Sequence, residues 1–335
     1  MKARLKKHWF LVGMALIWGL GFVFPALSKA YQRSGLVDWA IALVMFCGGL
    51  TLETARILEQ ARNWRALALS AVMMFLLAPL IVLAGTAPLQ LLHSELARQL
   101  FVGFMILAAQ SCTLGSGIVI STAARGNVPL ALVVTIFNSM LAALMTPMIL
   151  GVTLGVHTGF DVIGMMGRLA LIILLPVVVG QGLRPLLRTP LRSVGWLPSI
   201  LTQLVILSLI FMSVGSAADW MRRSPGLVLA LLAATLVLHA LILAANYAVS
   251  RLATRDVACR RSLAICSSQK TLATGSYVWS KYFSSNPLGG IPLMFYHVVQ
   301  LVFDSLLAHW LAARDERASA PPTLELLEKA EAEQG

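Results

Sequence analysis

Long apolar runs are the feature that most limits what this chain can fold into. Ten of them approach the length that crosses roughly 30 Å of hydrocarbon. They lie at about 9–26, 36–52, 66–84, 99–121, 129–151, 166–183, 198–217, 226–249, 260–282 and 288–312. With 58% hydrophobic and 12% charged residues, the 335-residue chain has too little polar surface to coat a soluble globule of its size. Because lipid offers the backbone no hydrogen-bond partner, we expect an all-α integral membrane protein with ten transmembrane helices.

The basic residues favour one orientation in the membrane. The first run follows a cluster of Lys and Arg, as a signal peptide does, but it is long, contains tryptophan and lacks a clear cleavage site, so we interpret it as an uncleaved span. With the N-terminus inside, the cytoplasmic segments carry Lys2, Arg4, Lys6, Lys7, Arg56, Arg62, Arg65, Arg125, Arg184, Arg188, Arg192, Arg251, Arg255, Arg260, Arg261, Arg314 and Arg317. The outer segments carry Lys29, Arg33, Arg98, Arg168, Arg222, Arg223 and Lys281. This is the positive-inside asymmetry, so we expect both termini in the cytoplasm, and the net charge of +12 requires no nucleic acid partner.

An internal repeat indicates how the spans are organised. The stretch "CTLGSG" at 112–117 falls in the fourth span and "KTLATG" at 270–275 in the ninth, and they share the pattern T-L-x-[S/T]-G. Because five spans separate them, the second half crosses the membrane in the opposite sense, which is the plan of many secondary transporters. We therefore predict a transmembrane domain over 1–312, built from inverted repeats at about 8–152 and 162–312, and a cytoplasmic tail over 313–335.

The two repeated stretches are rich in Ser, Thr and Gly, which weaken a helix and supply polar groups for a buried site. Irregular backbone is tolerated at membrane depth only where protein or a water-filled cavity surrounds it, so we predict discontinuous fourth and ninth helices that face each other. The alternative is that these small residues only allow helices to approach closely.

These residues resemble the bile acid:sodium symporter superfamily, and within it the SBF-like branch that includes animal solute carrier family 10 member 7. The resemblance covers about residues 8–312 and rests on "SCTLGSGIVISTAARGN" at 111–127, "IFNSMLAALMTP" at 136–147, "LLPVVVGQGLRP" at 174–185 and "CSSQKTLATG" at 266–275. It implies a core domain of helices three to five and eight to ten, and a panel of helices one, two, six and seven. It also implies alternating-access transport of organic anions, in many members with sodium.

The resemblance places sodium ligands where this sequence has poor ones. They fall at Gly117, Ile118, Ala131 and Cys266, which offer no side-chain oxygen, whereas Thr135 keeps its hydroxyl. A glutamine ligand falls at or next to Lys270. We therefore expect weakened or absent sodium sites. The candidate substrate- or ion-binding residues are Cys112, Thr113, Ser116, Asn127, Thr135, Asn138, Ser267, Ser268, Gln269, Lys270, Thr271, His297 and Asp304.

Lys270 is the most unusual of these candidates, because an ionised lysine at the membrane centre costs about 2.5–3.5 kcal/mol. Three roles remain open: a fixed cation in place of an ion, a proton carrier, or half of a structural ion pair. Asp304 is the expected counter-charge, and the i, i+3, i+7 spacing of His297, Gln300 and Asp304 predicts one polar face toward the ninth helix. His239, alone in its span, is expected to be a packing residue.

The leading functional prediction is a secondary transporter of a small organic anion or amphipathic acid in a bacterial inner membrane. The coupling ion of such a transporter is a proton or sodium, and the sequence indicates no cofactor or metal centre. The P-loop pattern and the H-E-x-x-H and G-x-S-x-G motifs are absent from the sequence, so we expect neither an ATPase nor another enzyme. An arsenite-type metalloid exporter using Cys112, and a non-transporting membrane sensor on the same scaffold, are the alternatives.

Overall fold

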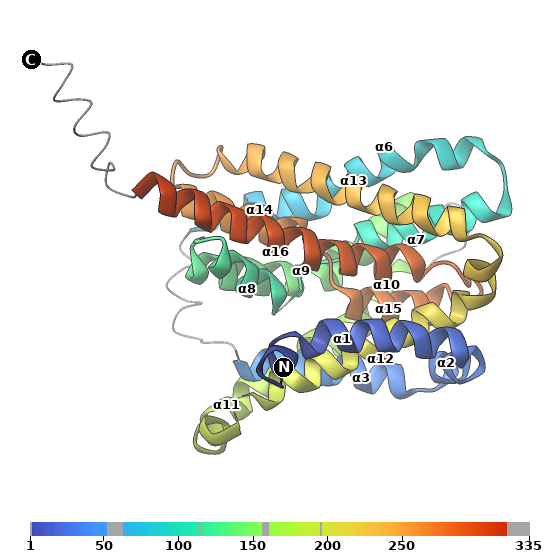
Figure 1. Ribbon diagram of the computed structural model, residues 1–335, viewed down its shortest axis with the longest axis horizontal. Helices are drawn as coiled ribbons and strands as arrows, with labels where there is room; N and C mark the ends of the chain where they lie inside the picture. The colour runs from blue at the N-terminus through green and yellow to red at the C-terminus, as the bar shows by residue number, and fades with distance from the viewer. Residues whose placement is uncertain (1, 52–62, 114, 156–160, 195, 320–335) are drawn as a thin grey trace, which may run out of the picture.

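The computed structural model of the protein describes residues 2–51, 63–113, 115–155, 161–194 and 196–319, and within these ranges the chain is helical without strands (Figure 1). Arg56, Arg62 and residues 320–335 of the predicted tail lie outside the described residues. The helices are α1 (Lys2–Val23), α2 (Pro25–Arg33), α3 (Leu36–Thr51), α5 (Trp64–Val72), the π-helical turn η1 (Met73–Leu77), α6 (Ala78–Leu91), α7 (Glu95–Ala108), α8 (Ser116–Ala123), α9 (Val128–Leu154), α10 (Val162–Leu169), the π-helical turn η3 (Ala170–Leu174), α11 (Leu175–Val194), α12 (Leu197–Arg223), α13 (Pro225–Ser250), α14 (Val257–Ser268), α15 (Leu272–Tyr282) and α16 (Ile291–Ser319).

Six described segments are long and apolar enough to cross a membrane. They are Trp64–Leu91, Val128–Leu154, Val162–Leu187, Leu197–Arg223, Pro225–Ser250 and Ile291–Arg317. The pair α1 and α2, bent by 97° at its junction, makes a seventh if it counts as one span. Large apolar side chains such as Leu80, Leu175, Leu229 and Leu306 are exposed on these helices. Such exposure suits a lipid-facing surface, and the chain is a multi-pass membrane protein.

Two of the remaining predicted spans are interrupted helices. The stretch predicted at 99–121 forms α7 and α8, with non-helical backbone from Ala109 to Gly115 where it is described. The stretch predicted at 260–282 forms α14 and α15, which are separated by 269–271. The two breaks lie side by side, because the backbone N–H of Thr271 donates to the carbonyl of Ser111 at 2.8 Å. The side chains at both breaks, 110–113 and 269–271, are buried.

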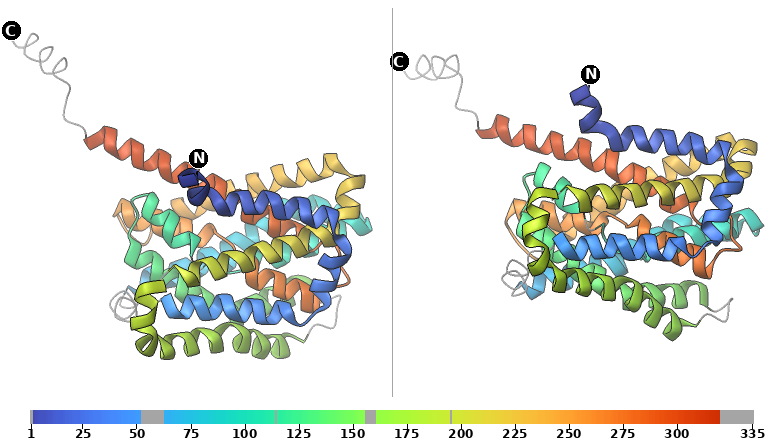
Figure 2. Two further views of the ribbon diagram at one scale, coloured as in Figure 1. Left: turned by 60° about the horizontal axis from the view of Figure 1, so that its bottom comes forward. Right: turned by 90° about the horizontal axis from the view of Figure 1, so that it is seen from below.

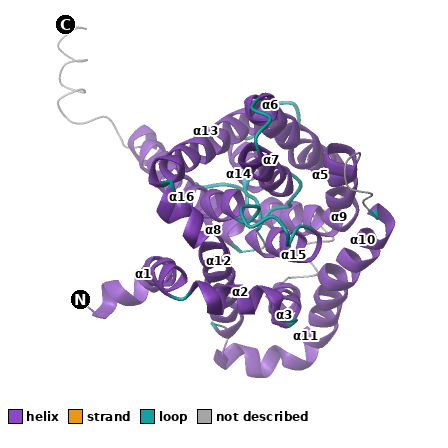
Figure 3. Ribbon diagram, turned by 90° about the vertical axis from the view of Figure 1, so that its right-hand side faces the viewer, coloured by secondary structure: helices purple, strands orange, loops and turns teal. Residues whose placement is uncertain are grey.

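The helices pack in two groups (Figures 2 and 3). The first group contains α1, α2, α3, α11 and α12, and the second contains α5 to α9 and α13 to α16. In the first group, close approach of α3 and α11 depends on glycine: a Cβ added to Gly180 would lie 2.5 Å from the carbonyl oxygen of Phe46. Contacts of α15 with α3 and α12, and the Lys281–Asp38 ion pair at 2.8 Å, join the groups at one end.

The last helix extends beyond the predicted domain boundary at residue 312. It continues to Ser319 because its final turns have partners on neighbouring helices. Asp315 accepts two hydrogen bonds from Arg261 of α14, at 2.5 and 2.8 Å, and Glu316 pairs with Arg125 at 2.5 Å. The first part of the predicted tail is thus tied to the interrupted helices.

Candidate functional site

Lys270 lies in the break between α14 and α15 and is 1% exposed. Its Nζ donates to three backbone carbonyl oxygens, those of Met74 at 3.0 Å and of Ala108 and Gln110 at 2.9 Å each. The sulfur of Met74 lies 3.3 Å away. Three carbonyl acceptors match the three N–H groups of an ammonium.

These carbonyls are available because of local backbone features. The last carbonyls of a helix lack intrahelical partners, and Ala108 ends α7. At η1 the N–H of Ala78 donates to the carbonyl of Met73, five residues earlier. In the same register the carbonyl of Met74 would accept from residue 79, which is proline and has no N–H. The carbonyl of Met74 is therefore left for another donor. The negative end of the α7 dipole also favours a cation there.

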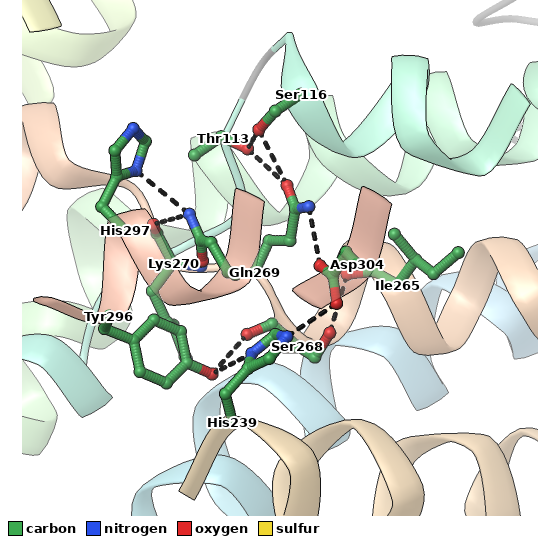
Figure 4. A network of polar contacts seen from close by, with 11 residues as sticks. Thr113, Ser116, His239, Ile265, Ser268, Gln269, Lys270, Tyr296, His297 and Asp304 are labelled. Carbon is green, nitrogen blue, oxygen red and sulfur yellow. Dashed lines mark hydrogen bonds and ion pairs between the residues drawn. The ribbon is translucent and has the colours of Figure 1, made fainter. Parts of the chain in front are cut away.

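The prediction that Lys270 and Asp304 form an ion pair is wrong. The Asp304 carboxylate, 1% exposed, contacts other groups: its Oδ1 lies 2.7 Å from Nε2 of His239, and its Oδ2 accepts from Nε2 of Gln269 at 2.9 Å (Figure 4). The prediction failed because it assumed that a buried cation needs a carboxylate, whereas the broken helices supply enough backbone oxygen.

The predicted polar face of α16 is confirmed by its contacts with the ninth stretch. The side chain of Gln300 brackets the Lys270 backbone: its Oε1 accepts from the lysine N–H at 2.7 Å and its Nε2 donates to the lysine carbonyl at 3.0 Å. The second N–H of this amide points to Nδ1 of His297 at 3.1 Å. Gln300 thus satisfies backbone groups that the break would otherwise leave unpaired.

Gln269 links Asp304 to the other break. Its Oε1 accepts from the hydroxyls of Thr113 at 2.7 Å and Ser116 at 2.9 Å, which themselves form a very short contact. Thr113, Ser116, Gln269 and Asp304 therefore form one chain of hydrogen bonds that runs from α16 to the start of α8 (Figure 4).

Two members of the site were not predicted. His239 of α13 was expected to be a packing residue, yet it contacts Asp304 through one ring nitrogen and the hydroxyl of Tyr296 through the other, at 3.1 Å. Tyr296 was not singled out at all, and its hydroxyl donates to the carbonyl of Ser268 at 2.8 Å. The sequence carries no signal that joins residues 65 positions apart, such as His239 and Asp304.

A cavity of about 370 Å³ opens between the two helix groups beside this network. One wall contains Thr113, Ser116, Thr271 and His297 from the second group. The opposite wall contains side chains of α1, α3 and α12, namely Phe10, Val44, Met45, Cys47, Thr51, Pro198, Ser199, Thr202, Gln203 and Ile206. It is a mainly apolar space with a few polar groups, which is the usual character of a small-molecule site.

Three further candidates, Cys112, Ser267 and Asn138, are buried and have other surroundings. Cys112, 1% exposed, accepts a hydrogen bond from Thr135 at 3.7 Å and lies beside Cys266. The hydroxyl of Ser267 is buried without a partner in the described structure. Asn138 contacts Ser70 at 3.2 Å.

Asn127 has a structural explanation at the start of α9. Its side chain caps the helix by accepting from the N–H of Leu130 at 2.9 Å, and its amide donates to the sulfur of Cys259 at 3.3 Å. The structure therefore does not bring Asn127 or Asn138 into the network around Lys270.

Interrupted helices that meet around a buried lysine, with a cavity beside them, describe a membrane transporter. A family model for SBF-like CPA transporters matches residues 8–313, and the chain belongs to that family. The predicted resemblance to the SBF-like branch of the bile acid:sodium symporter superfamily is confirmed.

Curated relatives match over most of the chain. One is "Putative symporter YfeH" of Escherichia coli, 26% identical over 310 residues, which cover 90% of this chain and 92% of that protein. Another is "Sodium/bile acid cotransporter 7" of Danio rerio, 21% identical over 335 residues, with 94% of this chain and 97% of that protein covered. "Uncharacterized protein PA2026" of Pseudomonas aeruginosa is 28% identical over 300 residues, with 86% and 89% covered.

Proposed function

We propose that this protein is a secondary active transporter that moves a small organic anion or amphipathic acid through the cavity beside the broken helices. The observation that carries the proposal is a buried donor in the cavity wall. His297 is 2% exposed, and its Nε2 has no hydrogen-bond partner in the described structure.

The hydrogen bonds around His297 indicate which atom carries its proton. Gln300 uses its Oε1 to accept from the Lys270 backbone, so the atom facing Nδ1 of His297 is the amide nitrogen, a donor. Nδ1 must then accept, and the proton of the neutral ring belongs on Nε2. An unpaired N–H in a largely apolar cavity favours a ligand that brings an acceptor, such as a carboxylate or sulfonate.

The packing supports a transport cycle in which one helix group moves against the other. The cavity separates the groups on one side, whereas Lys281–Asp38 and the contacts of α15 join them on the other. We assign the first group, with α10, to the panel and the second to the core. Ten crossings follow if α1 with α2, α3 and each interrupted pair count as spans, and the repeated pattern at 113–117 and 271–275 relates the halves as inverted repeats. We further propose a bacterial inner membrane with both termini in the cytoplasm.

In this proposal Lys270 takes the place of a transported or bound ion. Its ammonium is held by three carbonyl oxygens, the kind of ligand that unwound backbone offers to sodium in such transporters. Two of the three atoms nearest to a Cβ added at Gly117 are sulfurs, those of Cys112 at 2.9 Å and Cys266 at 3.5 Å, and the third is Oε1 of Gln269 at 3.4 Å. Thiols are soft ligands and poor donors for sodium, so we propose that the sodium sites are weakened or absent.

The experiment that tests the proposal is a thermal-shift titration of the purified protein with taurocholate and benzoate as probe anions. We expect at least one of them to raise the melting temperature saturably. His297→Asn should abolish that rise, because asparagine can place an acceptor near the Nδ1 position for Gln300 but lacks the Nε2–H.

His309→Gln is the matched control on the same helix. His309 is exposed and its Nδ1 contacts the carbonyl of its own helix at Ser305, 2.7 Å away, so its replacement should leave the anion response intact. Equal anion responses in the wild type and His297→Asn would contradict the assignment of His297 to the substrate site.

A further inference from the structure

The buried pair of His239 and Asp304 has a geometry that requires a proton. Both side chains are fully enclosed, at 0% and 1% exposure, and Nε2 of His239 lies 2.7 Å from Oδ1 of Asp304. At that distance a bare ring nitrogen and a bare carboxylate oxygen would repel each other. One proton must lie between them.

The hydrogen bonds of Tyr296 settle where the other ring proton is. The hydroxyl of Tyr296 has one proton and gives it to the carbonyl of Ser268, which can only accept. The hydroxyl oxygen is then an acceptor for Nδ1 of His239, so Nδ1 carries a proton. The shared proton on the Nε2 side is therefore an additional one, and the pair is neutral overall whether that proton sits on His239 or on Asp304.

Two of the titratable groups near the pair are held by hydrogen bonds to other partners. Among the described residues, the titratable groups near the pair include Tyr296 of α16, Cys266 of α14 and Lys270, which follows the Gln269 that bonds to Asp304. The hydroxyl of Tyr296 donates to the carbonyl of Ser268, and the ammonium of Lys270 donates to three backbone carbonyls. The ring of Phe303 packs edge-on against His239, with centroids 5.6 Å apart, so this side of the pair is apolar.

Loss of the shared proton would change the hydrogen bonds that hold the cavity wall. A charged Asp304 facing the lone pair of Nε2 would be pushed away from α13, and its Oδ2 is the acceptor that orients Gln269. Gln269 in turn holds the hydroxyls of Thr113 and Ser116, which form part of the cavity wall. The proton on α13 and α16 and the cavity wall at α8 are thus connected by one continuous set of hydrogen bonds.

We propose that His239 and Asp304 form a proton-binding site, and that binding of a proton there is coupled to binding of the organic anion in the cavity. The coupling half of this inference rests on the proposed function, whereas the proton site stands by itself. The proton is taken from water onto the pair and returned to water, with no other bond made or broken.

Asp304→Asn is the informative variant because asparagine imitates the proton-loaded carboxyl. Its Nδ2 can donate to Nε2 of His239, and its Oδ1 can accept from Gln269, so every hydrogen bond of the pair is kept while the exchangeable proton is removed. Thr235→Val is the matched control, because Thr235 is buried on α13, the helix of His239, and its hydroxyl donates to the carbonyl of Leu232 within the same helix.

The first measurement compares melting temperatures of purified proteins from pH 5 to pH 9. Below the pH at which the native pair releases its proton, we expect the wild type to lose about 2 °C per pH unit relative to Asp304→Asn as the pH rises, and above that pH the difference should level off. Thr235→Val should follow the wild type. A difference between the wild type and Asp304→Asn that stays constant with pH would overturn the proton site. Should Asp304→Asn fail to fold, His239→Gln serves the same comparison, since an amide cannot take up the proton.

The second measurement tests coupling in weakly buffered solution with a pH-sensitive dye. Addition of the anion that gives a thermal shift, taurocholate or benzoate, should change the number of bound protons in the wild type and not in Asp304→Asn. Equal proton changes in both proteins would overturn the coupling while leaving the proton site standing. If neither anion binds, the proposed function fails on its own test and the melting comparison still decides the proton site.

Discussion

Removal of the Lys270 ammonium offers the sharpest test of how the broken helices are held together. In Lys270→Met the side chain keeps its approximate length and loses all three donors, so the carbonyls of Met74, Ala108 and Gln110 become buried and unpaired. Each unpaired group costs about 1–3 kcal/mol. The gross loss is therefore about 3–9 kcal/mol, and it is partly offset because the variant no longer has to bury a charge.

We expect a net loss near 3–5 kcal/mol, the range found when one partner of a buried charged interaction is removed. For a chain of 335 residues this corresponds to a fall of roughly 4–7 °C in melting temperature. Lys270→Gln should lose less, because its amide carries two N–H groups, although its side chain is one atom shorter and cannot reach all three carbonyls.

The assay is thermal unfolding of the purified protein in detergent, with Lys281→Met as the control. Lys281 is also on the ninth stretch but is partly exposed, and its single ion pair with Asp38 should contribute only about 0–1 kcal/mol. A Lys270→Met protein that melts within about 2 °C of the wild type, or no lower than Lys281→Met, would refute the role of the ammonium in stabilising the break.

Two further predictions concern sodium and helix packing. Because Gly117 and Cys266 supply no side-chain oxygen, sodium should stabilise the protein no more than potassium or choline at equal ionic strength, and a saturable sodium-specific rise in melting temperature at low millimolar concentration would contradict this. Gly180→Ala should lower stability by about 1–3 kcal/mol because its new Cβ would lie 2.5 Å from the carbonyl of Phe46. Gly182→Ala on the same helix meets nothing within 4 Å and should be close to neutral, so equal effects of the two changes would argue against the close packing of α3 and α11.

The sequence predicts which stretches carry the site, because their composition is unlike the rest of the chain. Lys270 stands out by its cost in a membrane, and the repeated Thr-Leu pattern at 113 and 271 points to two related breaks. The spacing of His297, Gln300 and Asp304 is sufficient to place them on one helix face. These inferences use only local periodicity and the energetic cost of polar groups in lipid.

The partners within the site could not be predicted in the same way. The ligands of Lys270 are backbone carbonyls, which every residue has, and they become available only where helices end or change register. Pro79 is a partial signal for one of them, since it removes the N–H that would otherwise compete for the Met74 carbonyl. The contact of His239 with Asp304 depends on the packing of α13 against α16, which hydropathy does not determine.

The charges in the site balance in a way that suits an anion. The His239–Asp304 pair is neutral while it holds its shared proton, so it does not offset Lys270. The ammonium is held by uncharged carbonyls. With Lys270 protonated and the pair holding its proton, these groups together carry a net charge of +1, and the hydrogen bonds of Asp304 reach Thr113 and Ser116 in the cavity wall through Gln269. In surroundings of low dielectric constant this charge attracts an anion strongly, and loss of the shared proton would leave Asp304 negative and cancel the attraction. The same proton can thus control both the hydrogen bonds of Gln269 and the affinity of the cavity for an anionic substrate.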